Sequence, residues 1–201
     1  MDQLGDNVGF ETETLVVMGV AGSGKSTVGQ SLAEHTGAHF IDADAHHPLT
    51  NIEKMRAGIA LSDDDRKPWL STLAGLIIDP THPRKVLACS ALKDDYRSIL
   101  RNGNHRVHFA CLVVPQDELL RRLETRSTHF FKPELLDSQL RALEIPEGEQ
   151  FDGTLAVHAI VTLLARRANW PARNTPAHVS STLSLRAPFS PRDLAIEPKE
   201  G

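Results

Sequence analysis

One short segment limits what this chain can fold into: residues 19–26 read GVAGSGKS and fit the pattern G-x-x-x-x-G-K followed by Ser or Thr. An apolar run, TLVVMG (14–19), precedes it, and KSTVGQSLAEHT (25–36), with apolar residues at helical spacing, follows it. Glycines let the backbone turn successive N–H groups toward an anion, and the start of a helix adds its positive dipole end. A glycine-rich turn that matches by chance is the alternative, but the strand and helix in register favour a nucleoside triphosphate site.

This loop supplies the candidate ligands of the triphosphate. Lys25 is expected to reach the β- and γ-phosphates, and the Ser26 hydroxyl to ligate Mg²⁺. The predicted nucleotide-binding residues of the loop are Gly19, Gly22, Ser23, Gly24, Lys25, Ser26 and Thr27.

Strand-like and helix-like segments alternate along the middle of the chain. Short apolar runs typical of buried parallel strands occur at 14–19, 39–44, 85–90 and 107–114. The segments between and after them predict helices at 25–36, 51–58, 65–78, 91–101, 117–126 and 133–144. This alternation predicts an α/β fold of three α/β/α layers, in which a central parallel sheet of four or five strands carries helices on both faces.

Composition narrows the class of protein. A net charge of −4 and an aromatic content of 5% argue against a nucleic-acid-binding protein. No run of about 18 apolar residues is available to span a membrane, and the acidic start MDQLGDNVGFETE does not resemble a secretory signal. Cys89 and Cys111 lie in apolar runs typical of reduced interior thiols, so we expect a cytoplasmic protein.

The 201 residues suit one well-buried domain with two flanking segments. Residues 1–13 form a polar lead-in, and residues 14–168 form the domain. Residues 169–201, rich in Pro and Ser, are predicted to be an irregular or disordered tail, with a smaller chance that they wrap another surface.

Acidic residues end the second predicted strand. Asp42 and Asp44 stand two apart, so on a strand their carboxylates face one site at the ligand-binding edge of the sheet. One then holds Mg²⁺ through water while the other orients or deprotonates an acceptor hydroxyl. The alternative is that these acids cap the following turn.

His46 and His47 come next, and we interpret them as substrate contacts, or as a turn fixed by Pro48, rather than as metal ligands.

Arg122 and Arg126 lie four residues apart on the helix predicted after the fourth strand, and therefore on one face of it. Such guanidinium groups stack on a base or hold a transferring phosphoryl group. A solvated basic stripe explains the same spacing equally well.

These segments together resemble a known family, the thermoresistant-type gluconate kinases, which are small P-loop kinases related to shikimate kinase. The resemblance covers about residues 14–150 and consists of GVAGSGKS (19–26), DADAHHP (42–48), NIEKMRAG (51–58), LSDDDRKPWL (61–70), ACSALKDDYR (88–97), RLETRSTHFF (122–131) and LLDSQLRALE (135–144). Nucleotide kinases share only the phosphate loop and the R-L-x-x-R pattern. The block DDDRKPWL, with CSALK after it, separates gluconate kinases from shikimate kinases.

The resemblance implies a P-loop kinase fold and the transfer of phosphate from ATP, with Mg²⁺, to the 6-hydroxyl of D-gluconate. It makes Lys25, Asp44 and Arg126 the catalytic residues, with Ser26 and Asp42 at the metal. The implied substrate contacts are Asp44, His47, Lys54, Arg66, Lys93 and His129, with Arg66 the favoured partner of the substrate carboxylate. Residues 126–134 resemble a lid that closes over ATP, so Arg122 is expected to pack on adenine and Arg126 to clamp phosphate. The resemblance also implies a homodimer, and packing for Trp69.

The sequence departs from this family in two places. Thr128 stands where the lid usually has glycine. After Glu144, the segment EIPEGEQFDG (144–153) runs almost directly into TLAVHAIVTLLARR (154–167), which reads as a helix alone. We therefore expect either that the fifth strand is missing, or that residues 154–160 form it and the last helix is stunted.

Alternatives to a working gluconate kinase remain. The shortened region is consistent with a catalytically impaired variant that binds nucleotide and serves in regulation or assembly. A kinase for shikimate or another small sugar acid is also consistent with the motifs. A GTPase is the least favoured, because the sequence contains no N-K-x-D.

Overall fold

The computed structural model describes residues 12–102, 104, 106–125 and 133–173. Within these ranges five strands form one parallel sheet in the order β2-β3-β1-β4-β5. The strands are β1 (Glu13–Met18), β2 (His39–Asp42), β3 (Arg84–Ala88), β4 (Val107–Val113) and β5 (Gln150–Asp152). The strand that precedes the glycine-rich loop is therefore the central one.

Helices connect and cover these strands. They are α1 (Lys25–Thr36), the 3-10 helix η1 (Ala43–His46), α2 (Leu49–Arg56), α3 (Asp63–Ile78), α4 (Asp94–Arg101), α5 (Gln116–Glu124), α6 (Pro133–Ala142) and α7 (Val157–Arg167). The strands predicted at 14–19, 39–44, 85–90 and 107–114 and the helices predicted between and after them are present, with ends that differ by a few residues. In the described part of the chain, no helix is long and apolar enough to cross a membrane.

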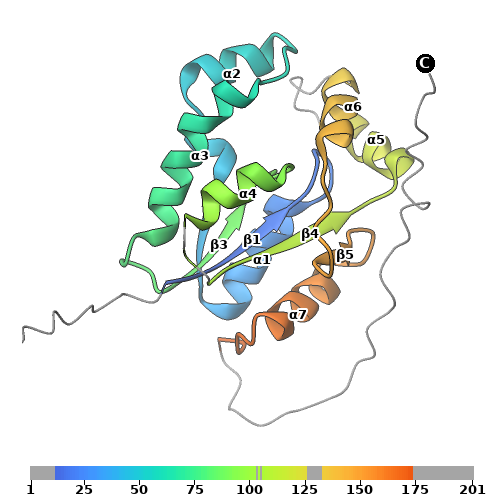
Figure 1. Ribbon diagram of the computed structural model, residues 1–201. Helices are drawn as coiled ribbons and strands as arrows, with labels where there is room; N and C mark the ends of the chain where they lie inside the picture. Colours follow the sequence, from blue (N-terminus) through green and yellow to red (C-terminus); the bar gives the residue numbers. More distant parts are fainter. Residues whose placement is uncertain (1–11, 103, 105, 126–132, 174–201) are drawn as a thin grey trace, which may run out of the picture.

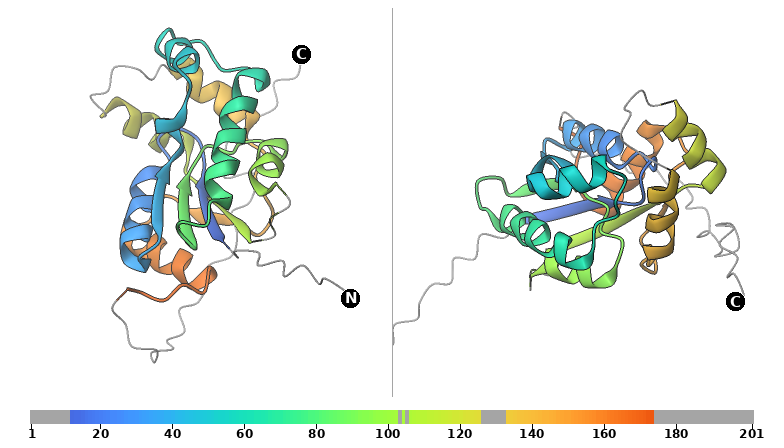
Figure 2. Two further views of the ribbon diagram at one scale, coloured as in Figure 1. Left: turned by 90° about the vertical axis from the view of Figure 1, so that its left-hand side faces the viewer. Right: turned by 90° about the horizontal axis from the view of Figure 1, so that it is seen from above.

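Alternation of side chains along β1 builds a core on each face of the sheet. Val16 and Met18 pack with α3 and α4, whereas Leu15 and Val17 pack with α1 and α7. Figures 1 and 2 show the resulting layers, with α3 and α4 on one side of the strands and α1 and α7 on the other. The predicted three-layer α/β/α fold is confirmed, and the parallel sheet, for which four or five strands are predicted, has five in the described part of the chain.

A third apolar cluster closes the end of the sheet at which the phosphate loop lies. It joins α5 and α6 to the segments that follow β1, β3 and β4, through Val20, Leu92, Val114, Leu119, Leu136 and Leu140. All six side chains are at least nine-tenths buried. This cluster holds α5 and α6 beside the loop, as Figure 1 shows.

The expected absence of the fifth strand is wrong. Residues Gln150–Asp152 form β5, which pairs in parallel with Cys111, Leu112 and Val113 of β4. The alternative placement of a strand at 154–160 is also wrong, because α7 begins at Val157. The strand fits into the short segment because it has only 3 residues. Its pairing with β4, rather than a long apolar run, defines it.

The chain after α7 folds back onto α1. Trp170 is 5% exposed and belongs to the core between α1, α7 and the sheet. Its backbone N–H donates to the Ala165 carbonyl at 2.9 Å, and the Arg173 N–H donates to the His35 carbonyl at 2.8 Å. The boundaries predicted at residues 13 and 168 stay predictions, and residues 1–11 and 174–201 lie outside the described residues.

Gly153, which follows β5, has no room for a side chain. A Cβ atom there would collide with Cγ2 of Val114 and lie 3.2 Å from the Val113 carbonyl oxygen. We predict that Gly153→Ala lowers the free energy of unfolding by about 1–3 kcal/mol, because the overpacking pushes β5 away from β4. Urea denaturation followed by circular dichroism measures this.

Gly75 in α3 is the matched control, because an added Cβ there meets nothing within 4 Å. Gly75→Ala should raise the free energy of unfolding by up to about 1 kcal/mol through helix propensity. An unchanged unfolding midpoint for Gly153→Ala would contradict the tight packing of β5.

Candidate active site

The phosphate loop connects the end of β1 to the start of α1, as the sequence predicts. Gly19 has a φ of 145°, and a Cβ there would lie 2.7 Å from Ser23 Oγ and 2.9 Å from the Leu112 carbonyl oxygen. Gly24 precedes the first residue of α1 with a φ of 95°. Only glycine suits both positions, so the loop can curl tightly against β4 and bring its backbone to the helix N-terminus.

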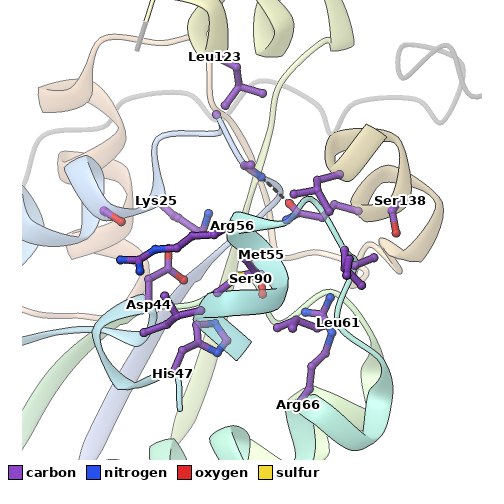
Figure 3. A pocket seen from close by; sticks show the side chains of 18 of the residues that line it. Lys25, Asp44, His47, Met55, Arg56, Leu61, Arg66, Ser90, Leu123 and Ser138 are labelled. Carbon is purple, nitrogen blue, oxygen red and sulfur yellow. Dashed lines mark hydrogen bonds between the residues drawn. The ribbon is translucent and has the colours of Figure 1, made fainter. Parts of the chain in front are cut away.

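A cavity of about 500 Å³ opens beside this loop. Its walls come from the phosphate loop and α1, from η1, α2 and α3, and from α5 and α6. The lining residues are Ala21, Gly22, Gly24, Lys25, Ser26, Asp44, His47, Ile52, Met55, Arg56, Ile59, Ala60, Leu61, Arg66, Ser90, Leu123, Leu135, Ser138 and Gln139. Figure 3 shows Lys25, Asp44, His47 and Arg66 around this hollow. Three cations and one carboxylate among these residues favour an anionic ligand.

The cavity collects about half of the predicted site residues. Those that line it are Gly22, Gly24, Lys25, Ser26, Asp44, His47 and Arg66. Those that the structure places outside its lining are Gly19, Ser23, Thr27, Asp42, Lys54, Lys93 and Arg122. Arg126, His129 and the lid up to residue 132 lie outside the described residues.

Asp42 and Asp44 do not both lie on a strand, so the prediction that strand alternation turns their carboxylates toward one site is wrong. The strand β2 ends at Asp42, and Asp44 lies in the 3-10 helix η1. Asp42 caps this helix, because its Oδ1 accepts the Asp44 N–H at 3.1 Å. Capping, the alternative considered for these acids, is therefore what Asp42 does, while Asp44 is exposed and lines the cavity.

Two lysines predicted to bind substrate are paired with acids at the start of α3. Lys54 Nζ lies 2.6 Å from Asp65 Oδ1, and Lys93 Nζ lies 2.8 and 2.9 Å from the two oxygens of Asp63. Tyr96 also donates its hydroxyl to Asp63, at 2.5 Å. These contacts fix the start of the helix that carries Arg66 into the cavity.

Asp65 and Ser62 form a capping box at the same helix start. The Ser62 hydroxyl accepts the Asp65 N–H at 3.2 Å, and the Asp65 carboxylate accepts the Ser62 N–H at 2.9 Å. The hydrogen bond from Lys54 and those from Ser62 lower the pKa of Asp65 to about 2. The carboxylate is thus charged at any physiological pH.

Arg122 lies at the edge of the phosphate loop. Its guanidinium donates to the Gly153 carbonyl at 3.0 Å and to the Gly22 carbonyl at 3.4 Å. Glu118, one turn earlier in α5, accepts the Arg122 Nε–H at 2.7 Å. Hydrogen bonds from Arg121 and Arg122 lower the pKa of Glu118 to about 2. Arg122 is therefore held in a defined position and is not part of a freely solvated stripe.

Arg56 and Gln139 are among the cavity residues that the sequence does not predict as site residues. Arg56 is the last residue of α2, and Gln139 lies in α6. The Gln139 Oε1 atom accepts the Ala21 N–H at 2.7 Å, the bond drawn dashed in Figure 3. Both residues belong to sequence blocks that the resemblance includes, NIEKMRAG and LLDSQLRALE. These blocks contribute to the family resemblance, but nothing in their sequence marks Arg56 or Gln139 as a site residue.

Comparison with known proteins defines the family. The family model for shikimate kinase matches residues 21–152. The thermoresistant gluconokinase of Escherichia coli K12 is 44% identical over 139 residues, which are 68% of this chain and 79% of that protein. The thermosensitive gluconokinase of the same organism is 43% identical over 142 residues, 70% of this chain and 76% of that protein.

The chain belongs to the gluconokinase family. A crystal structure of a gluconokinase from Sinorhizobium meliloti 1021 matches with a TM-score of 0.71 at 40% identity, over 79% of this chain and 95% of that one. The resemblance inferred from the sequence blocks is thereby confirmed. Because gluconokinases are ATP-dependent kinases, the family shows that this chain is an ATP-using enzyme.

The hydrogen bond from Ala21 to Gln139 joins the phosphate loop to α6, and we expect its removal to weaken ATP binding. Gln139→Leu leaves the Ala21 N–H without its acceptor, which typically costs about 1–3 kcal/mol. We predict that ATP affinity, measured by calorimetry with a non-hydrolysable analogue, falls by about tenfold. Gln30→Leu is the control and should leave the affinity unchanged, because the exposed Gln30 side chain bonds only the Glu34 side chain among the described residues. Equal ATP affinities for the two variants would show that the hydrogen bond between Gln139 and the phosphate loop does not support ATP binding.

The pKa of Asp65 predicts how stability changes with pH. Because the folded pKa is about 2 and the ordinary value is 3.8, the ion pair with Lys54 stabilises the fold above about pH 4 and is lost toward pH 2. The difference in the free energy of unfolding between the natural protein and Lys54→Met should therefore shrink between pH 6 and pH 3. Urea denaturation at several pH values measures it.

Lys67→Met serves as the control for this measurement, because it removes an ion pair whose side chains are 64% and 89% exposed. Its effect on stability should be small at every pH. A constant difference between the natural protein and Lys54→Met across the range would show that the pair does not shift the pKa of Asp65.

Proposed function

We propose that this protein transfers the γ-phosphoryl group of ATP to the 6-hydroxyl of D-gluconate, giving 6-phosphogluconate and ADP. The family supports this reaction. The observation that carries the proposal within this chain is the single cavity that Lys25 of the phosphate loop shares with Asp44 and Arg66. A phosphate site and a site for an acidic polyol thus lie side by side.

On the nucleotide side, we assign phosphate binding to the loop amides, to Lys25 and to Ser26. The loop geometry around Gly19 and Gly24 supports this assignment. Arg122 is assigned to the adenine side, because its guanidinium bridges the carbonyls of Gly22 and Gly153 at the loop edge. Arg126 as phosphate clamp and His129 as substrate contact remain proposals from the resemblance.

Mg²⁺ fits the residues at the end of β2 and the start of α1. Hydroxyl and carboxylate oxygens together with substrate phosphates are the ligands that Mg²⁺ prefers. Ser26 lines the cavity, and the Asp42 Oδ2 atom makes no hydrogen bond within the described part of the chain. Ser26, directly, and Asp42, through water, would hold the ion, which neutralises charge on the phosphates when bound.

Asp44 is the group proposed to engage the acceptor. Its carboxylate faces the cavity that also contains Lys25. It accepts the proton of the 6-hydroxyl as that oxygen bonds to the γ-phosphorus, while the bond from this phosphorus to the β–γ bridging oxygen breaks and ADP leaves. Lys25 is placed to stabilise the charge on the transferring group.

Arg66 is the proposed partner of the substrate carboxylate. Its guanidinium lies 5.7 Å from the centre of the Tyr96 ring and projects from α3 into the cavity. A planar guanidinium forms two parallel hydrogen bonds with a carboxylate. Arg56 lines the same cavity and adds a further positive charge. The pairing of Lys54 and Lys93 with acids supports an indirect role for these lysines, in fixing the start of α3.

The alternative of a catalytically impaired variant was based on the shortened region after Glu144, which was expected to lack the fifth strand. That basis no longer holds, because β5 is present and the carbonyl of Gly153, which follows it, accepts a hydrogen bond from Arg122.

We also propose a cytoplasmic homodimer. For the location, the support is that both cysteines are buried free thiols, as in a reducing compartment. For the dimer, the support is the family resemblance alone, and sedimentation of the full chain tests it.

A substrate screen tests the proposed reaction. The purified full chain is incubated with Mg·ATP and with gluconate, shikimate or other sugar acids, and ADP release is coupled to a spectrophotometric assay. We expect turnover that depends on gluconate. ATP hydrolysis at a comparable rate without gluconate, or a preference for another acid, would refute the assignment.

Asp44→Asn separates chemistry from binding. We predict that kcat with gluconate falls by about 10²–10⁴-fold, the usual contribution of a general base, while the Kd of ATP changes less than threefold. Steady-state kinetics and calorimetry measure the two quantities. Lys25→Met is the comparison, because it should abolish transfer through loss of a phosphate contact. If Asp44→Asn keeps its kcat, another group activates the hydroxyl.

A further inference from the structure

His47 is held in a fixed plane at the cavity wall. Its ring stacks on the indole of Trp69, with ring centres 4.1 Å apart and 14° between the planes. Trp69 is 2% exposed, and its Nε1–H donates to the Ala43 carbonyl at 2.9 Å, so the indole is itself fixed. His47 therefore presents a defined ring edge to the cavity that it lines (Figure 3).

Asn51 decides which nitrogen of this ring carries the proton. The Asn51 side chain is buried, and its Nδ2 donates to the Asp65 carbonyl at 2.9 Å, which identifies this end of the amide as the nitrogen. The same Nδ2 lies 3.4 Å from Nδ1 of His47. An amide nitrogen only donates hydrogen bonds, so the His47 Nδ1 is the acceptor. In a neutral imidazole the proton then resides on Nε2.

The surroundings of His47 keep the ring neutral. Burial lowers the pKa of His47 below its ordinary value, and the charge of Arg66 acts in the same direction, while Asp44 opposes both. Arg56, from α2, and Lys25, from α1, are the other cations that line the cavity. Within the described part of the chain, the Nε2 atom has no hydrogen-bond partner.

We propose that Asn51 is a positioning residue that fixes His47 as the Nε2–H tautomer, and that this N–H donates a hydrogen bond to an oxygen of the polyol acid. The second half of this inference rests on the proposed function. His47 then complements Asp44 on the same substrate, since one supplies a donor and the other an acceptor. A hydroxylated acid satisfies both groups, whereas an acid that lacks the hydroxyl leaves them unpaired.

Nuclear magnetic resonance tests the tautomer without any substrate. Long-range ¹H–¹⁵N correlation spectra of the full chain at pH 7 distinguish a protonated Nε2 from a protonated Nδ1 in each histidine. The spectrum of His47→Gln, or of His47→Asn should the first variant not fold, assigns the His47 signals by their loss. We expect Nε2–H for His47. An Nδ1–H tautomer, or a doubly protonated ring, would overturn the proposal even if gluconate is the substrate.

Kinetics test the contact with the substrate. His47→Leu, which removes the donor, should raise KM for gluconate by about tenfold with little change in KM for ATP. His47→Gln, whose amide nitrogen lies close to the position of Nε2, should recover most of this loss. His46→Leu is the control, because His46 is exposed and lies outside the cavity lining. Equal KM values for the Leu and Gln variants at position 47 would refute the donor role.

Asn51→Asp links the two measurements. A carboxylate at this position accepts rather than donates, so it should move the His47 proton to Nδ1, raise the pKa of His47 and raise KM for gluconate together. A spectrum that keeps the Nε2–H tautomer in this variant would show that Asn51 does not set it. If the tautomer is as expected but the protein turns over no gluconate, the proposed function fails and the assignment of the His47 proton stands.

Discussion

The close approach of the phosphate loop to β4 is the contact on which the rest of the site depends. At Gly19, where the loop leaves the central strand, a Cβ would lie 2.9 Å from the carbonyl oxygen of Leu112. The parallel register of β1 with β4 sets this approach, and the absence of a side chain permits it. Because the loop is pressed against the sheet, Lys25 and the first turn of α1 open directly into the cavity. A larger residue at Gly19 would displace the loop from everything it contacts.

Side chains from other elements hold the loop from the opposite side. Gln139 of α6 accepts the Ala21 N–H, and Arg122 of α5 donates to the Gly22 carbonyl. Arg122 also donates to the Gly153 carbonyl, which places the turn after β5 in the same network. The apolar cluster around Leu119 and Leu136 supports these two helices from below. The phosphate loop is thus held in place by segments that are distant in sequence.

Local signals explain what the sequence could predict. The phosphate loop and the helix after it are contiguous in sequence, so their residue pattern alone predicts a phosphate-binding site. The long apolar runs of β1 and β4 likewise predict buried strands. The strand β5 was missed because its residues Gln150–Asp152 carry no apolar run and owe their extended form to pairing with β4. The resemblance assigns Lys54 to the substrate. Its ion pair with Asp65, 11 residues away in sequence, becomes visible only in three dimensions. The contact of Gln139 with Ala21 joins residues 118 positions apart, and the proposed role of Asn51 depends on its contacts with both Asp65 and His47. No spacing rule predicts these contacts.

The indole of Trp170 has a consequence for where the stable unit ends. Sequence composition changes near this residue, and the last helix ends at Arg167, so a boundary at residue 168 looks natural. The side chain of Trp170 nevertheless fills the space between α1 and α7, and the backbone of Arg173 closes the end of α1. A shortened chain that stops at residue 168 would expose an apolar hollow directly behind the helix that bears Lys25. Any trimming of the C-terminus for crystallisation should therefore begin after Arg173.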